Sequence, residues 1–162
     1  MSDEFFTIAF RLGLSAFVGA LIGLNRDLHG KPAGVRTHAL VSLGTALMVI
    51  VVMPPGEDLT HRYDALSRVI QGVLTGIGFL GAGVILRDPG LRQVHGLTTA
   101  ATIWVTALLG VACGVGAYGP VLLAFAFGAL VMVFGGRFER TLRRRFRPVR
   151  GDPRESTIDP PS

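Results

Sequence analysis

Cysteine is nearly absent from the sequence, since Cys113 is the single cysteine in 162 residues. One cysteine excludes an intrachain disulfide and any zinc or iron–sulfur site built from several cysteines. The four histidines do not have the spacing of metal ligands either. We therefore expect no metal site and no bound cofactor, and we expect Cys113 to fill apolar space in a helix.

Charged residues are also scarce. They make up 17% of the chain, against about 25% in an average soluble domain, and none of them occurs between Arg92 and Arg137. Hydrophobic residues make up 49% of the chain, which excludes an intrinsically disordered protein. A soluble domain with a single core is not expected to contain so long an uncharged stretch. The composition therefore indicates an integral membrane protein.

The uncharged runs are long enough to cross a membrane. A helix needs about 20 mostly apolar residues to span the hydrocarbon core, and the stretch between Arg92 and Arg137 is too long for one such helix. Gly114, Gly116 and Pro120 supply a break inside it. The second run is short, so we expect this helix to tilt little or to begin within the preceding loop. The predicted spans are 5–24, 39–53, 69–86, 98–113 and 120–134.

The basic residues gather on one side of these spans. The first loop contains Arg26, Lys31 and Arg36, and the third contains Arg87 and Arg92. Most of the remaining basic residues lie in the C-terminal tail. Because Lys and Arg in short loops stay in the cytoplasm, we predict an all-α integral membrane protein with about five transmembrane helices, its N-terminus outside and its C-terminus cytoplasmic.

The net charge of +5 and the isoelectric point near 10.6 would also suit a nucleic-acid-binding protein. The cations form a terminal cluster and loop signals rather than a basic face, so we expect no nucleic-acid partner and take the lipid bilayer as the environment. We assign residues 1–140 to a transmembrane domain. Residues 141–162 form a basic, proline-containing tail that we expect to be disordered.

Small residues are concentrated within the predicted spans. Helices in lipid associate through small residues that let their backbones approach closely, and Ser15, Gly19 and Gly23 share one face of the first span at four-residue spacing. We interpret such faces as the packing surface of a compact bundle, with self-association into a homodimer as a further use. The predicted helix-packing glycines are Gly19, Gly23, Gly72, Gly76, Gly78, Gly81, Gly83, Gly110 and Gly114.

The third span also matches the glycine pattern of dinucleotide-binding loops, from Gly76 to Gly81. That motif requires a strand, a turn and an exposed helix N-terminus, with an acidic residue about 20 positions further on. Position 101 is alanine, so we reject nucleotide binding. An alternative remains, in which the glycines let this helix break at mid-membrane, as half-helices do in transporters.

Arg11 is the only charged residue inside a predicted span. It lies about 9 Å into the first span, which lets it snorkel to the outer interface, make a hydrogen bond inside the bundle, or face a substrate. No Asp or Glu lies within any predicted span. Because magnesium is usually held by carboxylates, this composition counts against a dedicated cation pathway.

Two segments on the predicted cytoplasmic side carry candidate functional groups. Loop one flanks Asp27 with cations, and Thr98 and Thr99 open the fourth span, where a helix N-terminus favours anions. The two segments would form a basic pocket, or else the cations only set the topology and a threonine caps the helix. We predict no catalytic residue. The candidate polar and aromatic residues are Arg11, Arg26, Asp27, Arg36, Thr37, His38, Gln71, Arg87, Thr98, Thr99 and Trp104.

Three segments resemble, in the right order, the MgtC/SapB family of bacterial membrane proteins. They are Lys31–His38, Gly76–Leu86, and Gly96–Ala101 followed by Trp104. The resemblance covers residues 12–140 and implies a small multi-pass bundle in the bacterial inner (plasma) membrane. It also implies a link to growth under magnesium limitation, to acid or intracellular stress, and to survival inside host phagocytes. Some family members are described as restraining the F-type ATP synthase.

The sequence departs from the family pattern in two ways. Asn25 stands where members often have an acidic residue before Arg26, which leaves Asp27 for any charge pairing there. Longer members also carry a soluble C-terminal domain, which we expect this protein to lack.

These observations leave two functional hypotheses. The first is a non-enzymatic membrane protein that modulates another membrane complex, such as the F-type ATP synthase. The second is a small ion or solute transporter, magnesium-related and dimeric, with Arg11, the third-span glycines and Thr98–Thr99 lining its path. A third hypothesis, a hydrolytic enzyme, has the least support, because no nucleophile and base occur at a recognisable spacing in the sequence.

Overall fold

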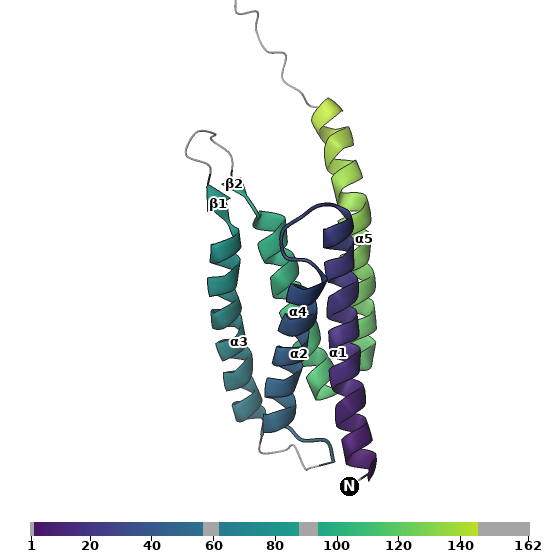
Figure 1. The fold of residues 1–162 in the computed structure, drawn as a ribbon, viewed down its shortest axis with the longest axis vertical. Helices are drawn as coiled ribbons and strands as arrows, with labels where there is room; N and C mark the ends of the chain where they lie inside the picture. Colours follow the sequence, from purple (N-terminus) through teal and green to yellow (C-terminus); the bar gives the residue numbers. More distant parts are fainter. Residues whose placement is uncertain (1, 57–61, 88–93, 146–162) are drawn as a thin grey trace, which may run out of the picture. The chain divides into compact units, whose positions relative to one another are not determined.

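The computed structural model describes residues 2–56, 62–87 and 94–145, with the side chains of all these residues except 86, 87, 94 and 137–144. This part of the chain is almost entirely helical (Figure 1). The helices are α1 (Ser2–Leu28), α2 (Val35–Val52), α3 (Tyr63–Val84), α4 (Leu97–Val115) and α5 (Tyr118–Arg145). A two-residue strand, β1 (Leu86–Arg87), pairs antiparallel with β2 (Val94–His95).

All five described helices are long and apolar enough to cross a membrane. The prediction of a five-span, multi-pass membrane protein is therefore confirmed, while the direction of insertion stays a prediction. α2 begins at Val35, inside the loop that precedes the predicted span, as its short apolar run suggested. α3 begins at Tyr63, before the predicted span, since the end of a membrane helix can carry charged residues such as Asp64 and Arg68.

The breaks between helices are glycine turns. α4 ends at Val115 and is capped by Gly116, whose φ of +88° places it in the left-handed region that favours glycine. α5 begins at Tyr118. Pro120 lies in the first turn of α5, where no intrahelical N–H is needed. α3 runs without interruption from Tyr63 to Val84, so the alternative of a mid-membrane break is wrong. The hydrogen bonds of this helix continue through its glycines.

The hairpin between α3 and α4 was not predicted. β1 and β2 place Leu86 opposite His95, and Gly96 follows with a φ of +90°. A Cβ at Gly96 would collide with the carbonyl oxygen of Val84, which only a glycine avoids. Gly96 therefore lets the start of α4 approach the end of α3.

Helix packing centres on α2 and α4. α1 packs against α2, α2 against α4, and α4 also contacts α1 and α3, and Figure 1 shows these helices side by side. Between α2, α3 and α4 lies an apolar core that includes Val49, Ile77 and Ile103. The chain divides into two units, Met1–Ala129 and Leu130–Ser162, and the tertiary contacts discussed below lie in the first. In the second, the described residues are the continuation of α5, so residues 141–145 of the predicted tail are helical and 146–162 lie outside the described part.

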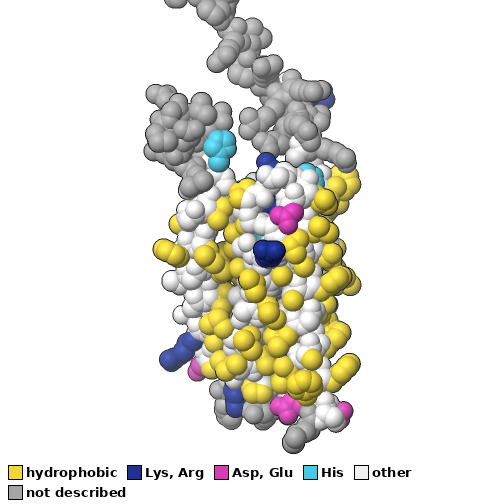
Figure 2. Space-filling model, in the orientation of Figure 1, with side chains coloured by type: hydrophobic (Ala, Val, Ile, Leu, Met, Phe, Trp, Pro, Cys, Tyr) yellow, Lys and Arg dark blue, Asp and Glu magenta, His cyan; other side chains and the backbone are white. Residues whose placement is uncertain are grey.

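Large apolar side chains cover the outside of the helices. Phe79 is 80% exposed and Phe5 is 75% exposed, which would be costly in water over so large an area. Figure 2 shows hydrophobic side chains over the middle of the visible face, with charged and histidine side chains mainly towards its two ends. Such a surface suits a hydrocarbon surrounding with polar boundaries.

Candidate functional site

Glycines bring α1 and α4 into close contact with α2. A Cβ built at Gly19 would lie 2.5 Å from the carbonyl oxygen of His38, and one at Gly23 would lie 2.6 Å from that of Gly34. On α4, a Cβ at Gly114 would lie 2.8 Å from the carbonyl oxygen of Ala46. Real Cβ atoms do not approach other atoms so closely, so these helix pairs can form only because glycine has no side chain at these positions.

Gly110 makes the tightest of these approaches. A Cβ there would overlap the hydroxyl of Thr45 and the carbonyl oxygen of Ser42, both on α2. This close approach also allows a hydrogen bond between the helices, because Thr45 Oγ1 lies 3.0 Å from the carbonyl oxygen of Ala107. Glycine and threonine thus act together to join α2 to α4.

Small polar side chains line the interior between α1, α2 and α4, and Ser42, Thr45, Thr102 and Thr106 among them were not predicted from the sequence. Thr102 donates to the carbonyl oxygen of Thr99, and Thr106 donates to that of Thr102, each at 2.8 Å. Their spacing of three and four residues puts them on one helix face, a signal that was available in the sequence. Six residues lie buried in this polar interior: His38, Ser42, Thr45, Thr99, Thr102 and Thr106.

His38 connects this interior to the beginning of α2. Its Nδ1 lies 3.0 Å from the carbonyl oxygen of Gly34, which can only accept, so Nδ1 carries the proton. Its Nε2 lies 3.3 Å from the hydroxyl of Thr102 on α4. The fully buried imidazole therefore links α2 to α4.

Arg26 points into the same end of the interior. It is only 6% exposed, and its Nη2 donates to the hydroxyl of Thr99. Its Nε is buried without a hydrogen-bond partner, and no carboxylate among the described residues forms an ion pair with it. Thr98, the neighbour of Thr99, is exposed instead. The two threonines, adjacent in sequence, therefore have different surroundings.

Arg11 makes a hydrogen bond inside the bundle. Its Nη1 donates to the carbonyl oxygen of Gly114 at 2.7 Å, and its guanidinium packs on Gly116 at the end of α4. Its Nε is buried without a partner. Of the three roles considered for this residue, the structure describes the internal hydrogen bond.

Asp27 caps α2. Its Oδ2 accepts a hydrogen bond from the backbone N–H of Val35 at 2.9 Å, and a Cβ built at Gly34 would collide with its carboxylate. The neighbouring candidates Arg36 and Thr37 are exposed on the first turn of α2. Loop one is therefore held together by Asp27, and its cations Lys31 and Arg36 are exposed, whereas Arg26 is buried.

The glycines of α3 are open, in contrast to Gly19, Gly23, Gly110 and Gly114. A Cβ at Gly72, Gly76, Gly78 or Gly83 would meet nothing within 4 Å, and one at Gly81 would make only an ordinary contact with Ala100. The interpretation of these four glycines as packing surface within one chain is therefore corrected. Spacing shows which glycines share a face, but only the fold shows whether that face meets another helix.

The remaining candidates lie on the outside. Gln71 is exposed on α3, where its Nε2 lies 3.3 Å from the hydroxyl of Ser67, and Trp104 is 44% exposed on α4. Arg87 belongs to β1, and its side chain lies outside the described residues. The structure thus brings together Arg26, His38 and Thr99, and it separates them from Gln71 and Trp104.

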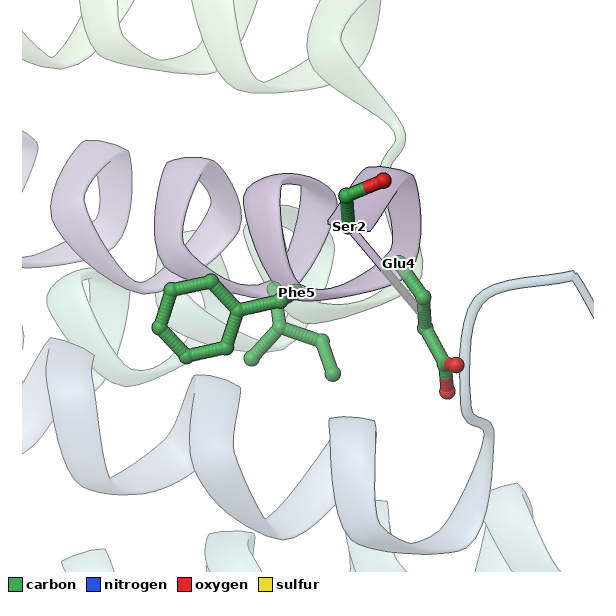
Figure 3. Close-up of a pocket in the computed structure, with 4 residues that line it drawn as sticks. Ser2, Glu4 and Phe5 are labelled. Carbon is green, nitrogen blue, oxygen red and sulfur yellow. The ribbon is translucent and has the colours of Figure 1, made fainter.

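A shallow, mostly apolar hollow at the start of α1 is lined by Ser2, Glu4, Phe5 and Ile8. Figure 3 shows that Ser2, Glu4 and Phe5 leave the helix in different directions rather than converging. The described residues contain no cluster of three or more histidine, cysteine or acidic side chains that would hold a metal ion.

Comparison with known proteins gives the family. Residues 12–141 match the MgtC family. Protein SrpB of Synechococcus elongatus is 47% identical over 82% of this chain and 77% of its own length. Protein MgtC of Salmonella typhimurium is 40% identical over 76% of this chain and 51% of its own length. YhiD of Escherichia coli is 43% identical over 73% of this chain and 54% of its own length.

This chain thus spans about half the length of the MgtC and YhiD proteins and about three quarters of SrpB. No solved structure matches it. The family match covers all three sequence segments that carried the resemblance, and the five apolar helices agree with a multi-pass membrane protein. The chain belongs to the MgtC family.

Proposed function

We propose that this protein acts in the bacterial inner membrane without catalysing a reaction, by helix contact with another membrane complex. We expect this contact to act under magnesium limitation, or under acid or intracellular stress. The F-type ATP synthase is one candidate for the contacted complex. The name of one relative supports the connection with magnesium, since YhiD is named as a candidate magnesium transporter. The direction of insertion, N-terminus outside, follows the charge distribution.

The observation that carries the proposal is the open face of α3. Four of its glycines have no neighbouring atom within 4 Å of a built Cβ. Gln71 and Thr75 are also exposed, although the helix is apolar enough to cross a membrane. Small residues let a second helix approach closely, and polar side chains facing lipid gain by finding a partner there. This combination is typical of a helix that receives another membrane helix.

Co-purification tests this contact. Gly76→Leu places a bulky side chain on the open face of α3, and Gly44→Leu is the matched control, because a Cβ at Gly44 also meets nothing within 4 Å. We expect wild type and Gly44→Leu, purified from magnesium-starved cells, to retain a membrane complex that Gly76→Leu loses. Recovery of the same proteins with all three chains, or of none, contradicts the proposal.

The alternative function is transport of an ion or small solute by a dimer. One observation favours it: Arg11 Nε, Arg26 Nε and Ser42 Oγ are buried without hydrogen-bond partners, and polar interiors of this kind can hold water. The absence of Asp and Glu from the predicted spans weighs against magnesium as the cargo. Purified protein reconstituted in liposomes tests this alternative. Transport predicts a flux of magnesium or another ion above that of empty vesicles, and its absence contradicts the alternative.

A further inference from the structure

Arg26 is a buried cation without a counterion among the described residues. Its side chain is 6% exposed, and the single hydrogen bond recorded for its guanidinium goes to the neutral hydroxyl of Thr99. The Nε–H has no partner. An unpaired buried charge is costly, and proteins normally pair such a charge or bind it to a ligand of opposite sign.

The nearest acidic residue in the sequence does not fill this role. Asp27 is exposed, and its carboxylate accepts a hydrogen bond from the N–H of Val35. His38, the other titratable residue buried at this end, uses Nδ1 to bond the carbonyl oxygen of Gly34. Neither Asp27 nor His38 accepts a hydrogen bond from Arg26, so the Arg26 guanidinium has an N–H group without an acceptor.

Arg26 lies against the N-terminus of α4. The residue to which it donates, Thr99, belongs to the first turn of that helix. The first N–H groups of a helix have no intrahelical acceptors, and Gly96, at the N-cap position, supplies no side-chain acceptor. Leu97 and Thr98 are exposed, which leaves this turn accessible from outside the bundle. The positive end of a 19-residue helix and a buried guanidinium thus meet at one place.

We propose that this end of the bundle binds the phosphate group of an anion, with Arg26 and the first turn of α4 as its ligands. The guanidinium presents several N–H donors in a planar fork that matches phosphate oxygens. The hydroxyl of Thr99 accepts from Arg26, so its own hydrogen is available to donate to the phosphate. The free N–H groups of the first turn complete a helix N-terminal phosphate site. This site is separate from the α3 face and does not depend on the function proposed above.

The phosphate has two possible sources, a phospholipid headgroup or free inorganic phosphate. Equilibrium dialysis of the full-length protein in detergent, with radiolabelled inorganic phosphate against chloride at equal ionic strength, tests the free anion. Native mass spectrometry with phosphatidylglycerol, compared with diacylglycerol, which lacks the phosphate, tests the headgroup. Saturable binding of inorganic phosphate indicates a soluble ligand, and selective retention of phosphatidylglycerol alone indicates a lipid ligand.

Variants assign the binding to Arg26. Arg26→Gln should weaken whichever ligand binds by about tenfold or more, because a hydrogen bond to a charged group is lost. Thr99→Val keeps the shape of the side chain and should also weaken binding. Arg36→Gln, which removes an exposed cation at the same end of α2, should bind as wild type does. The proposal is overturned if wild type binds neither ligand, or if Arg36→Gln loses as much affinity as Arg26→Gln.

Discussion

Arg11 on α1 donates a hydrogen bond to the carbonyl oxygen of Gly114 on α4, at 2.7 Å and across 103 residues of sequence. Carbonyl groups in the last turn of a helix have no intrahelical donor, and they lie at the negative end of the helix dipole. The Arg11 guanidinium of α1 therefore supplies a hydrogen-bond donor to a carbonyl group at the end of α4. The charge inside the first predicted span has a structural partner, and this partner is backbone.

Replacing Arg11 tests that relationship. Arg11→Gln should lower the free energy of unfolding by about 1.5–3 kcal/mol, the range for hydrogen bonds to charged groups, and Arg11→Lys should recover part of the loss. Thermal unfolding in detergent measures the change. Arg68→Gln, which removes an exposed cation from α3, serves as control and should leave the melting temperature unchanged. Equal melting temperatures for Arg11→Gln and wild type would show that the bond contributes nothing.

Gly110 should tolerate no side chain. Gly110→Ala forces a methyl group into the hydroxyl of Thr45 and the backbone of Ser42, and we expect overpacking to cost about 1–3 kcal/mol. Gly44→Ala is the control, because a Cβ there meets nothing within 4 Å, and alanine is the better helix former. A Gly110→Ala protein as stable as Gly44→Ala would mean that α2 and α4 are further apart than described.

The hydroxyl of Thr45 should contribute to the same helix pair. Thr45→Val removes the hydrogen bond to the carbonyl oxygen of Ala107, and we expect a loss of about 0.5–1.5 kcal/mol, as for hydrogen bonds between membrane helices. Thr75→Val is the matched change on α3, where the hydroxyl bonds only to Gln71 of its own helix. Unfolding in denaturing detergent should distinguish the two variants. A loss of equal size in both would remove the case for an interhelical bond.

Asp27 and Gly34 should show strong coupling. Asp27→Ala removes the cap of α2 and should cost about 1 kcal/mol. Gly34→Ala should cost more in the wild-type background, where its Cβ collides with the carboxylate, than in the Asp27→Ala background, where the carboxylate is gone. A double-mutant cycle of thermal stabilities measures the difference. Simple additivity of the two changes would contradict the described packing of loop one.

The fold could be predicted from the sequence to a large extent, because charge is excluded from lipid so strongly that uncharged runs mark the spans. Glycine turns such as Gly116 mark the breaks for an equally local reason, since few other residues adopt a positive φ. The hairpin at Gly96 was not predicted. Glycine is required there by the close approach of Val84, and a contact of this kind leaves no local pattern in the sequence.

The candidate site was less predictable. Gly76 and Gly110 belong to similar runs of small residues, yet one is open and the other lies against α2. Thr98 and Thr99 differ in the same way, since one is exposed and the other is buried against Arg26. Periodicity assigns a residue to a helix face, but the neighbour of that face is decided by packing over the whole bundle.

Photo-crosslinking from α3 tests its proposed contact most directly. Gly76→Cys and Gly44→Cys, each carrying a cysteine-linked photo-crosslinker, are compared in magnesium-starved cells, and native Cys113 does not interfere because it is fully buried. We predict a crosslink from position 76 to a different membrane protein, and none from position 44. Crosslinks from position 76 to lipid alone or to a second copy of this chain, or identical products from both positions, would contradict a contact of α3 with another membrane complex.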